Sequence, residues 1–280
     1  MNRRAGRRKS RYHGDAMSSF DMSSVRLFLF DVDGVFLAGK TDPRLISGQR
    51  AIAALRERGL PFRLLTNTST HPRSHLAETL QNLGVQVASE EIHSALETTV
   101  EVAARRFPGG RCLVVGEAGM RDLAARSGLE IVEDAPADVV LVGLTREADY
   151  GLLSAAARCL VRGAAMLGAH RNKLWQDEKG RALSCGPWLA ALEFATGVTA
   201  ETFGKPSRAF FDEAREPLGV SASATLMVGD DAMVDVRGAQ EAGLRAGLVL
   251  TGKTSREDPS RLGIEPDLVL EQVDDLADLL

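Results

Sequence analysis

Short apolar runs alternate with amphipathic segments along almost the whole chain. The runs have the length of strands buried on both faces, and we expect strands at residues 25–30, 61–65, 112–115, 139–142, 164–167, 225–228 and 246–250. Between them apolar residues recur at helical spacing, and we expect helices at residues 47–58, 72–83, 119–126, 150–162, 188–195, 207–216 and 234–242. A hairpin is expected at residues 175–183, around the turn Asp177-Glu178-Lys179-Gly180. The alternation predicts an α/β fold built on parallel sheets.

Polar motifs follow several of these expected strands. Asp31-Val32-Asp33-Gly34 comes directly after the apolar run of residues 27–30, and Thr66-Asn67 follows the next strand. Further on, the chain carries Gly204-Lys205-Pro206-Ser207 and then, after another strand, Gly229-Asp230-Asp231. Ligands of open α/β sheets bind at the carboxyl ends of strands, so we expect these motifs to meet at one sheet edge. Paired carboxylates there repel each other and require a cation or hydrogen-bond donors.

The interval from about residue 90 to 200 contributes none of these motifs. The simplest explanation is a catalytic domain interrupted by an inserted domain. We therefore expect a catalytic core at residues 23–90 and 200–280 and a cap domain at residues 91–199. Residues 1–22 carry six basic and two acidic side chains, and their polar, Gly- and Ser-containing composition predicts a disordered basic tail.

Charge and composition exclude several function classes. The 280-residue chain has a net charge of −4, of which the tail supplies about +4, so the remaining body carries about −8. An acidic body is a poor ligand for nucleic acid, and no nucleic-acid partner is expected. No apolar run approaches the roughly 20 residues of a membrane helix, so no membrane association is expected. Cys112, Cys159 and Cys185 are widely spaced and lack a CxxC pair, which indicates reduced thiols in a cytoplasmic protein.

The motif residues suit phosphoryl transfer, which needs a nucleophile, charge neutralisation at the phosphoryl oxygens and a proton for the leaving group. Asp31 can act as the nucleophile and form an aspartyl-phosphate. Asp33 can protonate the leaving oxygen and then activate water. Thr66 and Asn67 can hydrogen-bond the phosphoryl oxygens, and Lys205 adds a fixed positive charge.

A divalent cation would remove the repulsion between an anionic nucleophile and an anionic phosphate. Oxygen ligands favour Mg²⁺, and we expect Asp31 and Asp230 to bind it by their side chains and Asp33 by its backbone carbonyl. Asp231 and Asp235 are expected to orient these ligands from behind. The residues therefore predict a magnesium-dependent phosphotransferase site.

One further pattern is rejected. Residues 247–254 match the nucleotide-binding pattern GxxxxGK[ST]. Such a loop needs a strand before its first glycine and a helix that begins at the Lys-Thr pair. Here the interior positions are themselves the expected strand, and Asp258-Pro259 leaves little room for a helix. We therefore expect no nucleotide-binding loop.

With these motifs the sequence resembles the haloacid dehalogenase (HAD) superfamily, specifically its capped, NagD-like phosphatases. The motifs match in order, and the resemblance covers nearly the whole chain after the tail. In residues 186–211, 229–240 and 251–253 this sequence is similar to the branch that contains phospholysine phosphohistidine inorganic pyrophosphate phosphatase. The resemblance implies a Rossmann-like catalytic core with a parallel sheet and an inserted, mobile α/β cap.

The same resemblance implies Asp31 as nucleophile, Asp33 as acid/base and Mg²⁺ as cofactor. The presence of Asp33 favours phosphate-ester hydrolysis over dehalogenation. Thr68 stands where many NagD-like members have a second Asn, and its hydroxyl can substitute for the amide. Dimers in this family form through the cap, which implies a homodimer.

The cap is where substrate choice is expected to reside. A lid over the phosphoryl site favours small phosphorylated molecules over folded phosphoproteins. The candidate loop for contacting the leaving group comprises His170, Arg171, Asn172 and Lys173, and the sequence equally allows a solvated charged turn. Trp175 and Trp188 are expected in the cap core, with stacking on a substrate as the alternative for Trp175.

The leading hypothesis is therefore a phosphatase of small metabolites. A phosphotransferase or phosphomutase would use the same aspartyl-phosphate but would need an acceptor pocket that excludes water. A non-catalytic phosphoacceptor or ligand-binding module could also use acids and a lysine. Such a module has no use for an acid/base at Asp33, which separates it from the enzyme hypotheses.

Overall fold

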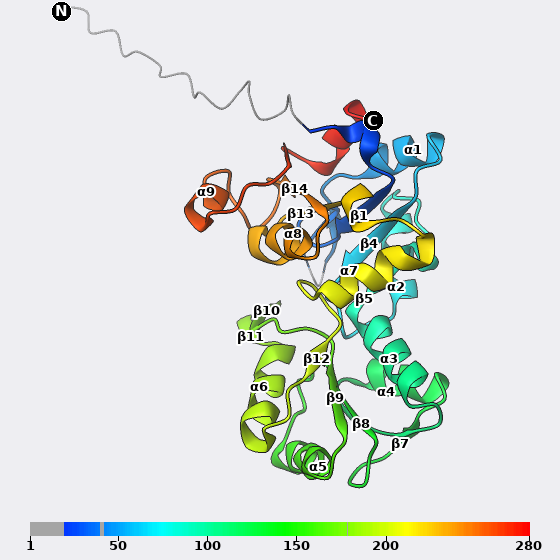
Figure 1. Ribbon diagram of the computed structural model, residues 1–280, viewed down its shortest axis with the longest axis vertical. Helices are drawn as coiled ribbons and strands as arrows, with labels where there is room; N and C mark the ends of the chain where they lie inside the picture. The colour runs from blue at the N-terminus through cyan, green and yellow to red at the C-terminus, as the bar shows by residue number, and fades with distance from the viewer. Residues whose placement is uncertain (1–19, 40–41, 178) are drawn as a thin grey trace, which may run out of the picture.

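The computed structural model describes residues 20–39, 42–177 and 179–280, which form two lobes, each built on a parallel sheet (Figure 1). Helices lie on the faces of the sheets, and strands and helices alternate along the chain. This arrangement confirms the predicted α/β fold with parallel sheets. No helix within the described residues is both long enough and apolar enough to cross a membrane.

The first lobe contains a six-stranded sheet with the strand order β15-β14-β13-β1-β4-β5, in which every pairing is parallel. Its strands are β1 (Leu27–Asp31), β4 (Phe62–Thr66), β5 (Ile92–Ser94), β13 (Thr225–Gly229), β14 (Arg245–Val249) and β15 (Leu268–Leu270). All five residues of β1 are buried, because this strand lies in the middle of the sheet and both of its faces are covered.

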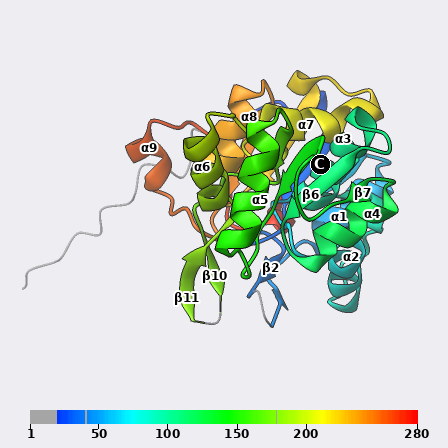
Figure 2. The same cartoon turned by 90° about the horizontal axis from the view of Figure 1, so that it is seen from below.

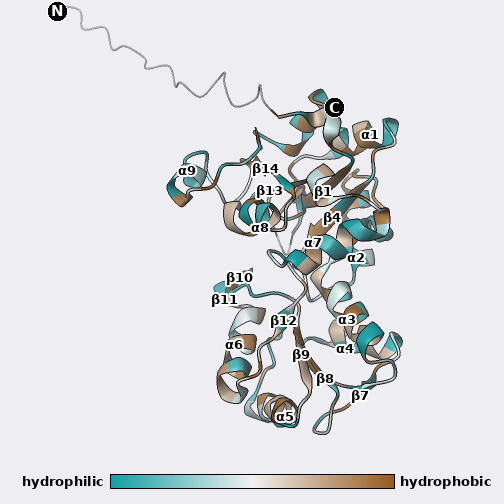
Figure 3. Cartoon of the chain, viewed as in Figure 1, coloured by the Kyte–Doolittle hydropathy of each residue, from teal (hydrophilic) through white to brown (hydrophobic). Residues whose placement is uncertain are grey.

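Alternate residues of β1 point into two different hydrophobic cores. Phe28 and Phe30 pack in one cluster with Ile52 and Leu55 of helix α1 (Gln49–Glu57), whereas Leu27 and Leu29 pack in another with residues of helix α7 (Arg208–Arg215). In Figure 3 the strands of the sheet carry mostly apolar colours, whereas the helices carry both polar and apolar colours. The continuous apolar run before Asp31 is therefore a consequence of burial on both faces.

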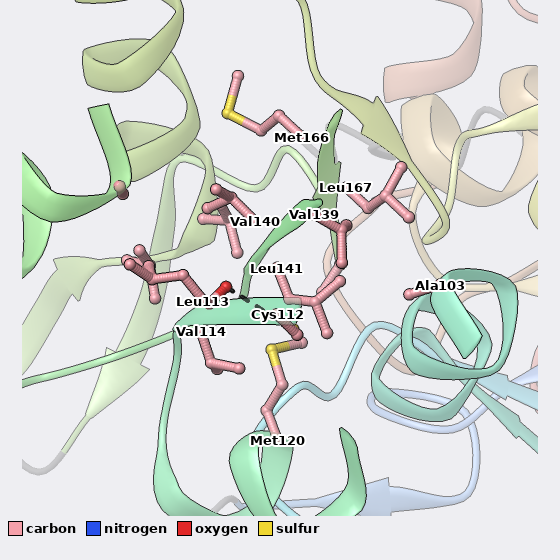
Figure 4. Packing of buried hydrophobic residues seen from close by; sticks show 14 of the residues in the cluster. Ala103, Cys112, Leu113, Val114, Met120, Val139, Val140, Leu141, Met166 and Leu167 are labelled. Carbon is pink, nitrogen blue, oxygen red and sulfur yellow. Dashed lines mark hydrogen bonds between the residues drawn. The ribbon is translucent and has the colours of Figure 1, made fainter. Parts of the chain in front are cut away.

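The second lobe contains a five-stranded sheet with the strand order β12-β9-β8-β6-β7, again parallel throughout. Its strands are β6 (Arg111–Val115), β7 (Glu130–Ile131), β8 (Val139–Val142), β9 (Ala165–Gly168) and β12 (Glu201–Thr202). Figure 4 shows its core, where Leu141 and Cys112 of neighbouring strands pack near Met120. Each lobe thus has its own hydrophobic core.

Two antiparallel hairpins extend from the sheets. The predicted hairpin is present as β10 (Leu174–Asp177) and β11 (Gly180–Leu183). A second one, β2 (Leu37–Ala38) with β3 (Arg44–Leu45), was not expected from the sequence. Seen from below in Figure 2, the β10–β11 hairpin projects from the same side of the molecule as β2.

The α-helices agree with most of the predicted segments. They are α1 (Gln49–Glu57), α2 (Arg73–Asn82), α3 (Ala95–Arg106), α4 (Ala118–Arg126), α5 (Tyr150–Val161), α6 (Cys185–Thr196), α7 (Arg208–Arg215), α8 (Gly238–Glu241) and α9 (Asp258–Leu262). The expected helix at 234–242 is instead a π-helix (Ala232–Arg237) followed by α8. Helix α9 corrects the expectation that Asp258-Pro259 leaves little room for a helix, because proline is tolerated in the first turn.

The described residues also contain short 3-10 helices. They are η1 (Met22–Ser24), η2 (Ser89–Glu91), η3 (Glu216–Leu218), η4 (Ala222–Ala224) and η6 (Val273–Asp278). Most of the tail predicted at residues 1–22 lies outside the described residues. Its last part packs on the body, because the Phe20 ring lies 5.4 Å from the Arg245 guanidinium and Asp21 caps η1. The expectation of disorder is therefore wrong for residues 20–22.

The two sheets divide the chain near the expected domain limits but not at them. β5 lies within the expected cap (91–199), yet it pairs with β4 in the first sheet. β12 lies within the expected core (200–280), yet it pairs with β9 in the second sheet. Strands of two or three residues show no periodicity that could assign them from sequence. The functional division into a core and a mobile cap stays a prediction.

Candidate active site

Three buried carboxylates converge where β1 and β13 end. Asp31 is the last residue of β1, Asp230 follows β13 directly, and Asp235 lies in the π-helix after it. One oxygen of each carboxylate lies within 4.8 Å of one oxygen of the other two. Asp31 and Asp230 meet because β1 and β13 are neighbouring parallel strands, which places their carboxyl ends at the same edge.

Lys205 neutralises part of this cluster. Its ammonium nitrogen lies 2.6 Å from Asp31 Oδ1 and 2.8 Å from Asp235 Oδ1, and the side chain is only 2% exposed. Burial alone would lower the pKa of Lys205, but the charges of Asp235 and Asp31 outweigh it and raise that pKa above its ordinary value. Lys205 is therefore a permanent cation in the site.

The cluster still has more negative than positive groups. Burial raises the pKa of Asp31 to about 6 against the opposing effect of Lys205, and burial together with Asp31 raises that of Asp230 to about 6. Asp230 Oδ2 accepts a hydrogen bond of 2.7 Å from the Lys253 amide, whereas Oδ1 is buried with no hydrogen-bond partner among the described residues. Orphaned, crowded carboxylate oxygens fit a hard divalent cation such as Mg²⁺.

The turn after β1 carries the second aspartate of the first motif. Asp33 is half-buried and forms a β-bridge with Leu37. Gly34 has a φ of +83°, and a Cβ atom there would lie 2.3 Å from Asp230 Oδ2. Only glycine therefore satisfies both the backbone conformation and the close approach to Asp230.

Thr66 at the end of β4 and Asn67 directly after it differ in their contacts. The buried Thr66 hydroxyl accepts a 3.2 Å hydrogen bond from the Thr68 amide, so its own proton remains available for donation. Asn67 Oδ1 accepts from the Lys205 amide over 2.7 Å, and Asn67 Nδ2 donates to the Lys205 carbonyl oxygen over 2.9 Å. The Asn67 amide is thus committed to the main chain of Lys205.

Asp231 and Asp235 were both expected to orient the metal ligands from behind. Asp231 Oδ1 accepts from the amides of Met233 and Val234, each over 3.0 Å, and so caps the π-helix. Asp235 Oδ2 accepts from the Asp231 amide over 3.1 Å, while its Oδ1 faces Lys205. The structure therefore places Asp235 within the carboxylate cluster itself and Asp231 beside it.

Asn172 of the candidate cap loop approaches the site. Asn172 Oδ1 lies 3.5 Å from Asn67 Nδ2. His170 is buried in the second lobe, and the Arg171 guanidinium binds Glu193 over 2.6 and 3.0 Å and the Ala200 carbonyl. Arg171 is thus a structural residue of the second lobe in this arrangement, because its donors are taken up by partners there.

The two cap tryptophans occupy different surroundings. Trp188 packs against the core of the second lobe, as expected. The Trp175 ring lies 5.2 Å from the Arg146 guanidinium, a cation–π contact within that lobe. Stacking of Trp175 on a substrate stays a prediction.

The sequence did not reveal that the loop Thr251–Thr254 belongs to the site. Gly247 to Val249 lie within β14, which confirms the rejection of a nucleotide-binding loop. The rejected pattern nevertheless lies at the site, because β14 neighbours β13 and the loop after it contacts Asp230. Its position after a strand at the same sheet edge was the signal that could have identified it.

Family comparisons agree with this geometry. The family model described as "Haloacid dehalogenase-like hydrolase" matches residues 28–130, and a second family model, described as HAD-hydrolase-like, matches residues 202–278. The chain belongs to the haloacid dehalogenase-like hydrolases.

Several proteins that are similar to this chain are named as phosphatases. Human phospholysine phosphohistidine inorganic pyrophosphate phosphatase is 30% identical over 92% of this chain and 95% of its own length. The structure of a p-nitrophenyl phosphatase from Archaeoglobus fulgidus has a TM-score of 0.85 at 31% identity and covers 91% of this chain and 99% of its own. A glycerol phosphate phosphatase from Mycobacterium tuberculosis in complex with calcium has a TM-score of 0.79 at 27% identity, over 92% of this chain and 77% of its own.

Proposed function

We propose that this protein is a Mg²⁺-dependent phosphatase that hydrolyses small phosphorylated molecules through an aspartyl-phosphate on Asp31. The observation that carries the proposal is the buried cluster of Asp31, Asp230 and Asp235, in which the Lys205 ammonium pairs with Asp31 and Asp235 and Asp230 Oδ1 has no hydrogen-bond partner among the described residues. Buried charge of one sign is costly unless a counter-charge balances it. A bound cation next to a carboxylate nucleophile is also what the transfer of an anionic phosphoryl group requires.

In the first step, a carboxylate oxygen of Asp31 attacks phosphorus. We assign the attack to Oδ2, because Oδ1 already accepts from the Val32 amide over 2.7 Å and lies 2.6 Å from the Lys205 ammonium. The bond between phosphorus and the leaving oxygen breaks, and protonated Asp33 gives its proton to that oxygen. The products are an acyl-phosphate on Asp31 and the free leaving group.

In the second step, Asp33 acts as a base. Its carboxylate takes a proton from a water molecule, and the water oxygen attacks phosphorus. The bond between phosphorus and Asp31 breaks, so inorganic phosphate leaves, Asp31 is again a carboxylate and Asp33 is again protonated.

The remaining residues stabilise charge and hold the reacting groups. Mg²⁺, held by Asp31, Asp230 and the Asp33 carbonyl oxygen, would supply positive charge between the nucleophile and the phosphate. The Thr66 hydroxyl donates to a phosphoryl oxygen, because its oxygen already accepts from Thr68. Asn67, in contrast to the expectation from sequence, acts by holding Lys205.

The second lobe is proposed to act as the cap that selects substrates. It meets the first lobe near the site, where the Leu144 amide donates to Ser69 Oγ over 3.1 Å and Asn172 approaches Asn67. A lid at this place favours small leaving groups. The names of the similar phosphatases support small phosphate esters, pyrophosphate and phosphoramidates as the classes to test.

The experiment measures phosphate release from p-nitrophenyl phosphate, glycerol phosphate, pyrophosphate and phospholysine, with Mg²⁺ and with EDTA. We expect release that requires Mg²⁺ and that Asp31→Asn abolishes. Asp33→Asn is expected to accumulate a phosphoenzyme that intact-protein mass spectrometry detects, because the base of the second step is lost.

Asp122→Asn is the matched control, because this exposed aspartate lies on α4 in the second lobe. It should hydrolyse the same substrates at the wild-type rate. Full activity in Asp31→Asn, or no release from any compound by the folded wild-type protein, would contradict the proposed function.

We also propose that the protein is a cytoplasmic homodimer that associates through the second lobe. Three free, buried cysteines suit a reducing compartment. Tyr150 on α5 and Phe194 on α6 are 89% and 95% exposed, and large exposed aromatic side chains are typical of interfaces.

A further inference from the structure

The loop Thr251–Thr254 holds Asp230 by main-chain hydrogen bonds and has no part in the steps above. The Lys253 amide donates to Asp230 Oδ2 over 2.7 Å. The Thr254 amide donates to the Asp230 carbonyl oxygen over 3.1 Å. One short loop after β14 therefore fixes both the side chain and the main chain of this aspartate.

Glycine at position 252 brings the loop into contact with the carboxylate. A Cβ atom on Gly252 would lie 1.9 Å from Asp230 Oδ2, and one on Gly34 would lie 2.3 Å from the same oxygen. Oδ2 is therefore enclosed by two glycines and occupied by the Lys253 amide. Oδ1 of the same carboxylate is buried without a hydrogen-bond partner among the described residues.

The loop is also anchored to the turns on either side of the site. Thr251 Oγ1 donates to the Gly34 carbonyl oxygen over 2.5 Å, which joins the loop to the turn after β1. The Ala232 amide donates to Thr254 Oγ1 over 2.9 Å, which joins it to the π-helix after β13. These side-chain contacts fix the loop, and through it Asp230, relative to Asp31.

We propose that Thr251–Thr254 is a positioning loop that presents Asp230 to the cation through Oδ1 alone. The proposal rests on the Mg²⁺ site of the proposed function. Because Oδ2 is enclosed by Gly34 and Gly252 and bonded to the Lys253 amide, Asp230 would bind the cation as a monodentate ligand. Mg²⁺ accepts monodentate carboxylates in a strict octahedral arrangement, whereas Ca²⁺ takes more oxygen ligands and accepts bidentate carboxylates. The loop therefore favours Mg²⁺ over Ca²⁺ at this site.

The test compares Gly252→Ala with Gly247→Ala. Neither glycine has a positive φ, so alanine is compatible with both backbones. A Cβ atom on Gly247 would lie no nearer than 3.5 Å to another atom, which makes Gly247 a matched control on β14, the strand that precedes the loop. Affinity for Mn²⁺ is measured on the full chain by electron paramagnetic resonance of the free ion, and Mg²⁺ and Ca²⁺ are compared by competition.

We expect Gly252→Ala to bind Mn²⁺ about 10- to 100-fold more weakly, the usual cost of disturbing a group that orients a metal ligand. It should also lose part of the preference for Mg²⁺ over Ca²⁺, because the displaced carboxylate is no longer restricted to Oδ1. Gly247→Ala should bind all three ions as the wild type does. Circular dichroism without metal checks that both variants fold.

A second variant keeps the test decisive if Gly252→Ala does not fold. Thr251→Val conserves the side-chain shape but removes the hydrogen bond to Gly34, and it should weaken Mn²⁺ binding. If folded Gly252→Ala binds Mn²⁺ with wild-type affinity, the role of the loop is overturned. If Gly252→Ala does not fold, wild-type Mn²⁺ affinity in Thr251→Val overturns it instead. Wild-type protein that binds no Mn²⁺ would instead overturn the proposed cation site, and this inference with it.

Discussion

Asn67 is the residue that fixes the main chain of Lys205. Its amide accepts from the Lys205 N–H and donates to the Lys205 carbonyl oxygen, so one side chain holds the lysine at two points. The long Lys205 side chain then reaches Asp31 and Asp235 from a fixed origin. A side chain held at its base loses less conformational entropy when it forms such contacts. Asn67 is therefore a positioning residue.

Asn67→Ala is expected to lower kcat for p-nitrophenyl phosphate about 10-fold or more, with a smaller change in KM. The substitution leaves the N–H and carbonyl groups of Lys205 unpaired, at a cost of about 1–3 kcal/mol for each buried group. Steady-state kinetics and thermal unfolding measure both effects.

Asn172→Ala is the control for this prediction, since Asn172 contacts the same amide only at 3.5 Å. It should leave kcat and the melting temperature close to wild type. A wild-type kcat in Asn67→Ala would show that Lys205 is positioned without the Asn67 amide.

At the scale of secondary-structure elements, the site consists of the segments that follow neighbouring parallel strands. β1 supplies Asp31, the segment after β13 supplies Asp230, and the loop after β14 holds Asp230 in place. These strands are rigid because the sheet is buried on both faces. Burial in the same lobe also shifts the pKa of a titratable side chain, His93 on β5.

His93 on β5 should make folding stability depend on pH. Burial, and then the charges of Arg63 and Arg73, lower its pKa to about 3 in the folded protein, against 6.5 for the free side chain. The unfolded chain therefore binds a proton near pH 6.5 that the folded chain does not bind until about pH 3. The stability contribution is complete above pH 6.5 and is lost as the pH falls through this window, by about 2 kcal/mol at pH 5.

Urea unfolding of the wild type and His93→Gln at pH 7.5 and pH 5 measures this contribution. The other titratable groups are the same in both proteins, so their contributions to the pH dependence of stability cancel in the comparison. Glutamine can still hydrogen-bond Thr98 Oγ1, which lies 3.1 Å from His93 Nε2. The wild type should lose about 2 kcal/mol more than the variant between the two pH values. Equal losses in the two proteins would contradict the shifted pKa.

At the scale of the whole molecule, the outer surface of the second lobe is proposed to pair with a second copy of the chain. Phe194 is 95% exposed on α6, which packs on α5. A two-fold interface would bury this residue twice, and each burial stabilises the dimer by about 1.5–3 kcal/mol. Phe194→Ser should therefore raise the dimer dissociation constant at least about 100-fold.

Sedimentation velocity over a range of protein concentrations measures this change. Leu262→Ser is the control, since Leu262 is 44% exposed on α9 of the first lobe. Its dissociation constant should match that of the wild type. A wild-type protein that stays monomeric at all concentrations would exclude the proposed interface.

Much of the fold and of the candidate site could be predicted because buried parallel strands leave a clear pattern. The run before Asp31 is apolar throughout, and those before Thr66 and Asp230 end in apolar residues, so the polar residue that follows each run marks the end of its strand. The contacts of each polar group could not be predicted in the same way. Arg171 was a candidate for contacting the leaving group, yet it pairs with Glu193 of helix α6.

The sequence by itself determined the longer buried strands and the polar residues at their ends, because a strand covered on both faces is mostly apolar until it leaves the sheet. The tertiary structure alone decided which of these polar atoms pair. Asn67 and Lys205 lie 138 positions apart, and Lys253 lies 23 positions from Asp230. Such contacts depend on how the strands are ordered in the sheet, and local periodicity carries no information about that order.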